Sequence, residues 1–143
     1  MRLVWLLCSW SGWAADPVPA PIAATVAREW PNAQILEVED EGGAVEVELQ
    51  DGAARVDVLF RADGTWIEVK VAVAASELPK AVLAAASREG RVTEAERRST
   101  PDGRADWEIE VRDRQGSRVL HLDDAGRILR SRVEDDEEDD GEN

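Results

Sequence analysis

The sequence predicts an α+β fold, a tandem repeat of a helix plus a four-stranded antiparallel sheet, with the helices packed on one sheet face. Two stretches, 56–73 and 119–133, each hold two segments of alternating apolar and polar residues around a glycine-containing turn. The turns read Ala62-Asp63-Gly64 and Asp124-Ala125-Gly126, and Asp-Gly sequences are typical of hairpins. An apolar helical stripe precedes each set of strands, so the chain resembles a duplicated unit.

The first predicted unit spans residues 22–74. Ile22, Val26 and Trp30 follow one another at intervals of four, which places them on one face of a helix, and Pro31 ends that helix. Alternation of apolar and polar residues then predicts four strands, at 35–40, 44–50, 55–60 and 65–73.

The second predicted unit spans residues 75–133. An alanine-rich helix runs from Leu78 to about Arg88, and Gly90 is the residue type that commonly follows a helix end. The same alternation predicts four further strands, at 92–97, 107–111, 118–122 and 127–133.

Residues 1–14 have the features of a secretory signal peptide. Arg2 precedes a short apolar run over 3–13, and small residues favour cleavage after Ala14 or Ala15. Residues 15–21 are rich in proline and are interpreted as a linker. A periplasmic or secreted protein that is not inserted in the membrane after cleavage is expected, the alternatives being a buried N-terminal strand or an uncleaved anchor.

The only cysteine, Cys8, lies inside the predicted signal peptide. The mature chain would then form no disulfide, and its stability would come from packing. Lipid attachment at Cys8 is an alternative, although Leu7 fits that motif poorly because a small residue is expected there.

Acidic residues outnumber basic ones by 31 to 17, which gives the chain a formal charge of −14. Such a charge disfavours binding to nucleic acid or anionic membranes. Eight of the last ten residues, 134–143, are acidic and none is apolar, which predicts a disordered tail.

No catalytic or cofactor-binding constellation is evident in the sequence. It has one histidine, His121, no cysteine after signal cleavage and no Gly-x-Ser-x-Gly motif. The Asp-Gly turns lack the ligand spacing of a calcium loop. We therefore expect a non-enzymatic protein without a metal or cofactor, with a carboxylate-based hydrolase as the weaker alternative.

A partner-binding surface is predicted on the sheet face opposite the apolar core positions. Strict alternation assigns Ile67 and Val69 to the core and leaves Trp66 on the other face as an exposed aromatic anchor. The equally weighted alternative is a strand-edge tryptophan covered by Leu59 across the hairpin. The predicted surface comprises Trp66, Leu59, Glu68, Glu46, Glu48, Glu108, Glu110 and His121.

Three short motifs resemble the PepSY-like exported domains, which are similar in fold to the β-lactamase inhibitor protein. They are Trp-Pro-Asn-Ala-Gln-Ile-Leu-Glu-Val-Glu at 30–39, Phe-Arg-Ala-Asp-Gly-Thr-Trp at 60–66 and Leu-Asp-Asp-Ala-Gly-Arg-Ile-Leu at 122–129. The resemblance covers about residues 21–133, although 87–92 departs from the family's aromatic-Pro-Gly junction. It implies a non-enzymatic binding module of the cell envelope, of a kind sometimes thought to restrain peptidases.

These observations lead to one functional hypothesis and one principal alternative. The chain is expected to be an exported protein-binding or inhibitor-like module whose partner is a protein, either a basic one or a peptidase. The alternative is an acidic envelope protein that binds cations weakly through the tail at 134–143.

Overall fold

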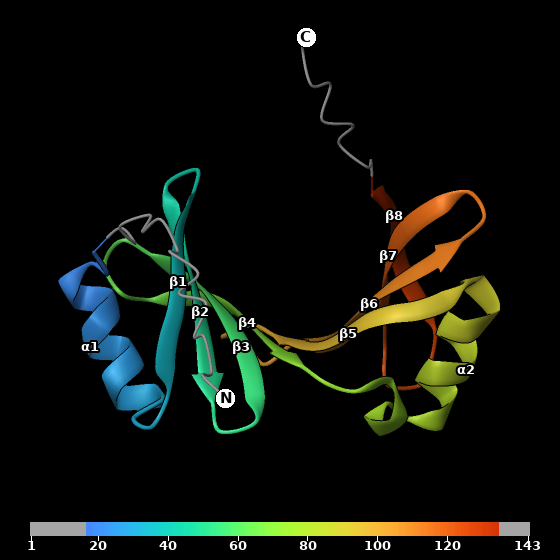
Figure 1. The fold of residues 1–143 in the computed structure, drawn as a ribbon, viewed down its shortest axis with the longest axis horizontal. Coiled ribbons are helices and arrows are strands. Elements are labelled where there is room, and N and C mark those ends of the chain that lie inside the picture. The colour runs from blue at the N-terminus through green and yellow to red at the C-terminus, as the bar shows by residue number, and fades with distance from the viewer. Residues whose placement is uncertain (1–16, 135–143) are drawn as a thin grey trace, which may run out of the picture.

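The structure is a computed structural model, which describes residues 17–134 (Figure 1). It contains the helices α1 (Ala20–Glu29) and α2 (Lys80–Glu89) and the short 3-10 helix η1 (Ala75–Glu77). The strands are β1 (Gln34–Glu41), β2 (Ala44–Asp51), β3 (Ala54–Arg61), β4 (Trp66–Ala72), β5 (Arg91–Ser99), β6 (Ala105–Asp113), β7 (Gly116–Leu122) and β8 (Ile128–Glu134).

All eight strands form one antiparallel sheet in the order of the sequence. The prediction of two tandem units, each a helix with its own four-stranded sheet, is wrong, because β4 pairs with β5 from Val69 opposite Ser99 to Ala72 opposite Glu96. Two separate sheets would have left the backbone groups of both strands unpaired at exposed edges. The pairing of β4 with β5 satisfies these groups and makes the sheet continuous.

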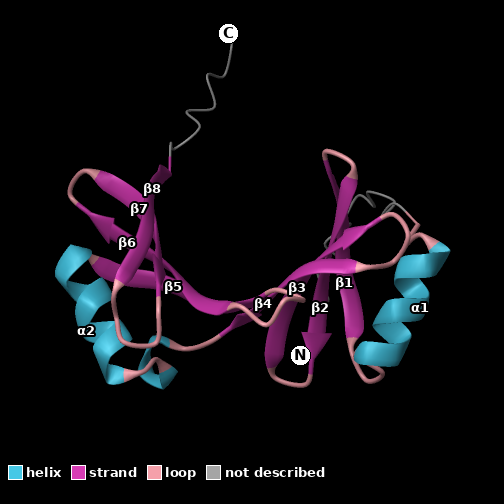
Figure 2. Cartoon of the chain, turned by 180° about the vertical axis from the view of Figure 1, so that it is seen from behind, coloured by secondary structure: helices cyan, strands magenta, loops and turns pink. Residues whose placement is uncertain are grey.

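Both helices pack on the same face of this bent sheet, one near each end (Figures 1 and 2). The helix α1 begins at Ala20, earlier than expected, because proline at the first turn needs no backbone N–H. The first core places Ile22 and Val26 of α1 over β2 and β3. The second places Val82 and Ala86 of α2 over β5, β6 and β7.

A single cross-strand row links the two cores and shows that they share a face. It runs through Leu49, Val56, Val71, Arg97, Trp107 and Leu122. The opposite face of the sheet carries no helix among residues 17–134. We call this uncovered face the open face.

Two glycine turns fix the hairpins against the helices. Gly64 and Gly126 have φ of 89° and 82°, a region that disfavours other residues. A Cβ on Gly64 would lie 2.5 Å from the carbonyl oxygen of Pro21, and one on Gly126 would meet the carbonyl oxygen of Ala81. The Thr25 hydroxyl also donates a hydrogen bond of 2.8 Å to the Gly64 carbonyl. These turns therefore have no room for a side chain.

Extra residues interrupt the regular alternation of several strands. In β4 the pairing passes from Leu59 opposite Glu68 to Phe60 opposite Trp66, which leaves Ile67 as a bulge residue. A bulge reverses the face on which the residues before it lie. Trp66 is therefore on the same face as Phe60 and packs, partly buried, against the first core. The prediction that Trp66 lies exposed on the opposite face is wrong.

The predicted signal peptide at 1–14, Cys8, the first two residues of the linker at 15–21 and all but the first residue of the tail at 134–143 lie outside the described residues. Within residues 17–134, no helix is long and apolar enough to cross a membrane.

Candidate functional site

The open face is built from charged residues that alternate with the core residues of each strand. One cross-strand row on it runs through Glu48, Asp57, Lys70, Arg98 and Asp106, from β2 to β6. Each member faces away from the helices because its neighbours in sequence belong to the core side. The row therefore crosses the junction between β4 and β5 and places two basic side chains at the centre of the open face.

Lys70 is the ammonium group at this centre. Its Nζ donates a hydrogen bond of 2.8 Å to Glu108 Oε1 and lies 3.9 Å from Glu68 and 4.0 Å from Glu96. Burial works to lower the pKa of Lys70, but the hydrogen bond to Glu108 and the charges of the other carboxylates outweigh it and raise the pKa. Lys70 thus remains a fixed positive charge.

Arg98 is the second basic group and joins three strands, because it lies on β5 and contacts side chains of β4 and β6. It donates hydrogen bonds of 2.9 and 2.6 Å to the two carboxylate oxygens of Asp106 and a third, of 2.9 Å, to Glu68. Burial acts to raise the pKa of Asp106, yet the hydrogen bonds and charge of Arg98 outweigh it and keep that pKa low. Bidentate pairing of this kind fixes both side chains in one geometry.

His121 is buried beside this network, with 6% of its surface exposed. Its Nε2 lies 3.0 Å from Arg130 Nη2 and 3.5 Å from Glu108, while its Nδ1 has no hydrogen-bond partner and lies 3.7 Å from Asp106. Burial lowers the pKa of His121, and Glu108 opposes this only in part. The imidazole is therefore neutral at pH 7.

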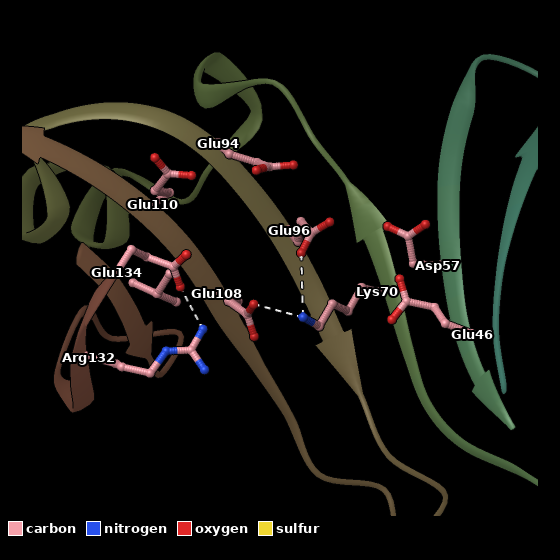
Figure 3. A pocket seen from close by; sticks show the side chains of 10 residues that line it. Glu46, Asp57, Lys70, Glu94, Glu96, Glu108, Glu110, Arg132 and Glu134 are labelled. Atoms are coloured by element: carbon pink, nitrogen blue, oxygen red, sulfur yellow. Dashed lines mark hydrogen bonds and ion pairs between the residues drawn. The ribbon is translucent and has the colours of Figure 1, made fainter. Parts of the chain in front are cut away.

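A hollow of about 220 Å³ opens next to Lys70 (Figure 3). Carboxylates dominate its wall, and several lie directly opposite one another, as Glu96 does to Glu108 and Glu94 to Glu110. Like charges in such pairs repel. The hollow, which we call the acidic hollow, is lined by Glu46, Asp57, Lys70, Glu94, Glu96, Glu108, Glu110, Val119, Arg132 and Glu134.

Burial and the repulsion between carboxylates act together on Glu96. Burial raises the pKa of Glu96 to about 7, with Glu94, Asp57 and Glu108 adding to the rise and Lys70 opposing it. Burial also raises the pKa of Glu46 and of Asp57. The acidic hollow thus holds more carboxylates than its own basic groups neutralise, which favours the approach of a cationic group from outside.

Seven of the eight residues predicted from the sequence lie on the open face. Glu46 and Glu68 flank half-buried Leu59 in one cross-strand row. Glu48 forms an ion pair of 2.5 Å with Arg55. Glu108, Glu110 and His121 lie across β6 and β7, and Trp66 is the residue on the opposite face.

The sequence reasoning missed Lys70, Arg98, Asp106 and Glu96. Their positions share the parity of Glu68 and Glu108, so alternation alone places them on the open face. Their mutual contacts depend on the pairing of β4 with β5, which the local pattern does not contain. Within residues 17–134, no group of three or more histidine, cysteine, aspartate or glutamate residues has an arrangement that could hold a metal ion.

The sequence matches the profile of a family described as "Putative beta-lactamase-inhibitor-like, PepSY-like" over residues 11–58 and 43–130. These two matches together cover most of the chain. The chain belongs to the PepSY-like family. No curated protein matches the sequence.

Solved structures of similar fold come from Bacteroides species. A "putative periplasmic" protein of Bacteroides eggerthii has 18% identity and a TM-score of 0.73, with 80% of this chain and 88% of that one covered. A DUF2874 family protein of Bacteroides ovatus has 18% identity and a TM-score of 0.74, with coverages of 83% and 89%. A BLIP-like protein of Bacteroides fragilis has 20% identity and a TM-score of 0.70, with coverages of 84% and 91%. Over 80–84% of its length, this PepSY-like chain therefore has the same fold as these proteins.

Proposed function

We propose that this PepSY-like protein is an exported, non-enzymatic module of the cell envelope that binds a protein partner through its open face, in the manner of an inhibitor. Membership of a family described as β-lactamase-inhibitor-like supports this proposal, as does the fold shared with a BLIP-like protein. The fold shared with a protein described as periplasmic supports a periplasmic location.

The observation that carries the proposal is the open face itself. A one-layer sheet with helices on one side leaves a broad surface uncovered, and here its side chains are already ordered by mutual pairs. Lys70 and Arg98 have only 28% and 25% of their side-chain surface exposed. A surface whose side chains are fixed before binding loses less conformational entropy when the partner arrives.

The charge of this surface indicates the chemistry of the partner. Seven carboxylates and two basic groups line the acidic hollow, and half-buried Leu59 lies beside it between Glu46 and Glu68. A partner segment that carries arginine or lysine next to an apolar side chain would complement both features. Such complementarity mainly speeds association and selects the partner.

Retention of envelope proteins by immobilised variants tests this proposal. Leu59→Arg adds a positive charge and a longer side chain to the open face, between two carboxylates that can accept it. The matched control, Ala84→Arg, adds the same residue to the exposed side of α2. A protein retained by wild type and by the control, but lost with Leu59→Arg, is the expected result. Equal retention by all three forms, or loss with the control alone, contradicts the proposal.

A further inference from the structure

Exposed apolar side chains gather at the two edges of the sheet. Among residues 17–134, the large hydrophobic side chains that remain exposed all belong to β1 and β8: Ile35, Leu36, Ile128, Leu129 and Val133, with exposed fractions from 36% to 64%. Such residues scattered over a surface need no explanation, but their concentration on two strands does.

The same two strands present unpaired backbone. Within the described chain, β1 pairs only with β2, and β8 pairs only with β7. Each therefore has one side on which N–H and C=O groups are free to pair with another strand. Six consecutive residues of β8, Ile128–Val133, are exposed. Neither edge is covered by α1 or α2.

The two edges carry opposite and unbalanced charge. In β1, Glu37, Glu39, Asp40 and Glu41 occur without a basic residue. The charge of Glu37 is the main cause that raises the pKa of Glu39, so the carboxylates of this edge repel one another. In β8, Arg132 pairs with Glu134 at 2.6 Å, whereas Arg130 has no carboxylate within 4 Å among the described residues.

The charged groups of both edges point to the same side of the sheet. Glu37 and Glu39 line a small hollow with Glu46 and Glu48 on the open face. Arg130 contacts His121, and Arg132 lines the acidic hollow, also on the open face. Because the sheet has an even number of antiparallel strands, β1 and β8 run in opposite directions. A second copy placed beside β8 in the same orientation therefore presents an antiparallel β1.

We propose that β8 of one copy of this protein pairs with β1 of a second copy, head to tail, and extends the sheet across the two molecules. In the antiparallel register that aligns the charges, Arg130 lies opposite Glu39 and Arg132 opposite Glu37. Val133 follows Arg132 and Leu36 precedes Glu37, so these two exposed apolar side chains lie at the same end of the pairing, next to the ion pair of Arg132 with Glu37. Leu36 and Leu129 are the bulge residues of their strands, so the regular pairing covers 37–39 and 130–132, at the short end of strand lengths.

The charges also select this pairing over the others. Two β1 edges would bring glutamates against glutamates, and two β8 edges would bring arginines against arginines, and like charges opposite one another destabilise a strand pair. Only unlike edges attract. Because the interface joins two different surfaces, further copies can add, and the assembly either closes into a ring or grows as an open chain.

Sedimentation velocity of the full chain over a wide concentration range tests this proposal. Wild type is expected to show a mass that rises with concentration. Arg130→Glu with Arg132→Glu should weaken association at least about tenfold, because two attractive pairs become repulsive. The control, Lys80→Glu with Arg114→Glu, makes the same change in net charge away from both edges and should associate as wild type does.

Two further variants distinguish a lost interface from a chain that fails to fold. Val133→Glu alters the edge at a site that is 64% exposed and should also weaken association. Glu37→Arg with Glu39→Arg should fail to associate alone but should associate when mixed with the Arg130→Glu, Arg132→Glu chain. The proposal is overturned if wild type stays monomeric, if edge and control variants associate equally, or if only removal of residues 135–143 abolishes association, which would make the tail the occupant of the edge.

Discussion

Replacement of Glu96 by glutamine should stabilise the protein at alkaline pH. The pKa of Glu96 is raised from 4.5 to about 7 in the folded protein, chiefly by burial, so the folded state resists its ionisation. A group with a raised carboxyl pKa supports stability fully below 4.5, and that support is lost as pH rises through about 7. Glutamine keeps the size and hydrogen bonding of the protonated acid and carries no charge at any pH.

The magnitude follows from the difference between the two pKa values. At about 1.4 kcal/mol for each pH unit, the shift corresponds to roughly 3 kcal/mol when Glu96 is fully ionised. The attraction of Lys70, whose Nζ lies 4.0 Å away, is already included in this net shift. We expect Glu96→Gln to raise the free energy of unfolding by about 3 kcal/mol at pH 8 and by less than about 1 kcal/mol at pH 5.

Urea denaturation of both proteins at pH 5 and pH 8 measures this difference. The control is Glu94→Gln, the same substitution two residues earlier on the same strand, where the side chain is exposed and the effect should stay within about 0.5 kcal/mol. If Glu96→Gln lowered stability at pH 8, ionised Glu96 would be a stabilising partner of Lys70. An equal change at both pH values would show that folding does not raise the pKa of Glu96.

Three further predictions concern the packing beneath the open face and the buried histidine. Gly126→Ala should lower the free energy of unfolding by about 2 kcal/mol or more, because φ is positive and the new Cβ would clash with backbone atoms. The control is Gly103→Ala, where φ is similar but no atom lies near the new Cβ, and it should cost about 1 kcal/mol in thermal or urea unfolding. Trp66→Ala should cost about 2 kcal/mol in the same assay, since the indole packs beside Phe60; an unchanged stability would return Trp66 to the solvent face. His121 should titrate in NMR below its ordinary pKa of 6.5, so its contribution to stability is present above that pH and is lost as pH falls; titration at or above 6.5 would show that the carboxylates outweigh burial.

The sequence predicted the positions of helices and strands well, because these depend on local periodicity. The stripe of Ile22 and Val26 and the alternation on both sides of Gly64 and Gly126 correspond to α1 and to the hairpins β3–β4 and β7–β8. It did not predict which strands lie side by side across the segment 73–79. The pairing of β4 with β5 is formed by backbone N–H and C=O groups, which nearly every residue has, so it leaves no local pattern in the sequence. For this reason a single sheet was mistaken for two.

The face of Trp66 shows a second limit. Alternation counts residues in twos, and one extra residue at Ile67 moves Trp66 to the other side of the sheet. The sequence pattern around 66–71 is compatible with a regular strand and with a bulged one, since β-branched residues and tryptophan are common in strands of both kinds. A bulge is decided by the fit against Phe60 and the first core, which only the folded structure contains.

The candidate site was predicted in its residues but not in its contacts. Parity placed Glu46, Glu68 and Glu108 on one face, as the register confirms. The contact of Lys70 with Glu108 joins residues 38 positions apart in the sequence. This contact requires the pairing of β4 with β5. Because two separate sheets were predicted, the contacts at the centre of the site could not be predicted either.

The central claim, that the open face binds a protein partner, is tested most directly by photo-cross-linking in the organism that makes this protein. A photoreactive amino acid at position 59, in place of Leu59, samples the open face, and the same residue in place of Ala84 samples the exposed side of α2. We predict a cross-linked adduct with another protein from position 59 and none from position 84. An adduct from position 84 alone, or no adduct from position 59 in cells that hold the folded protein, would contradict the claim.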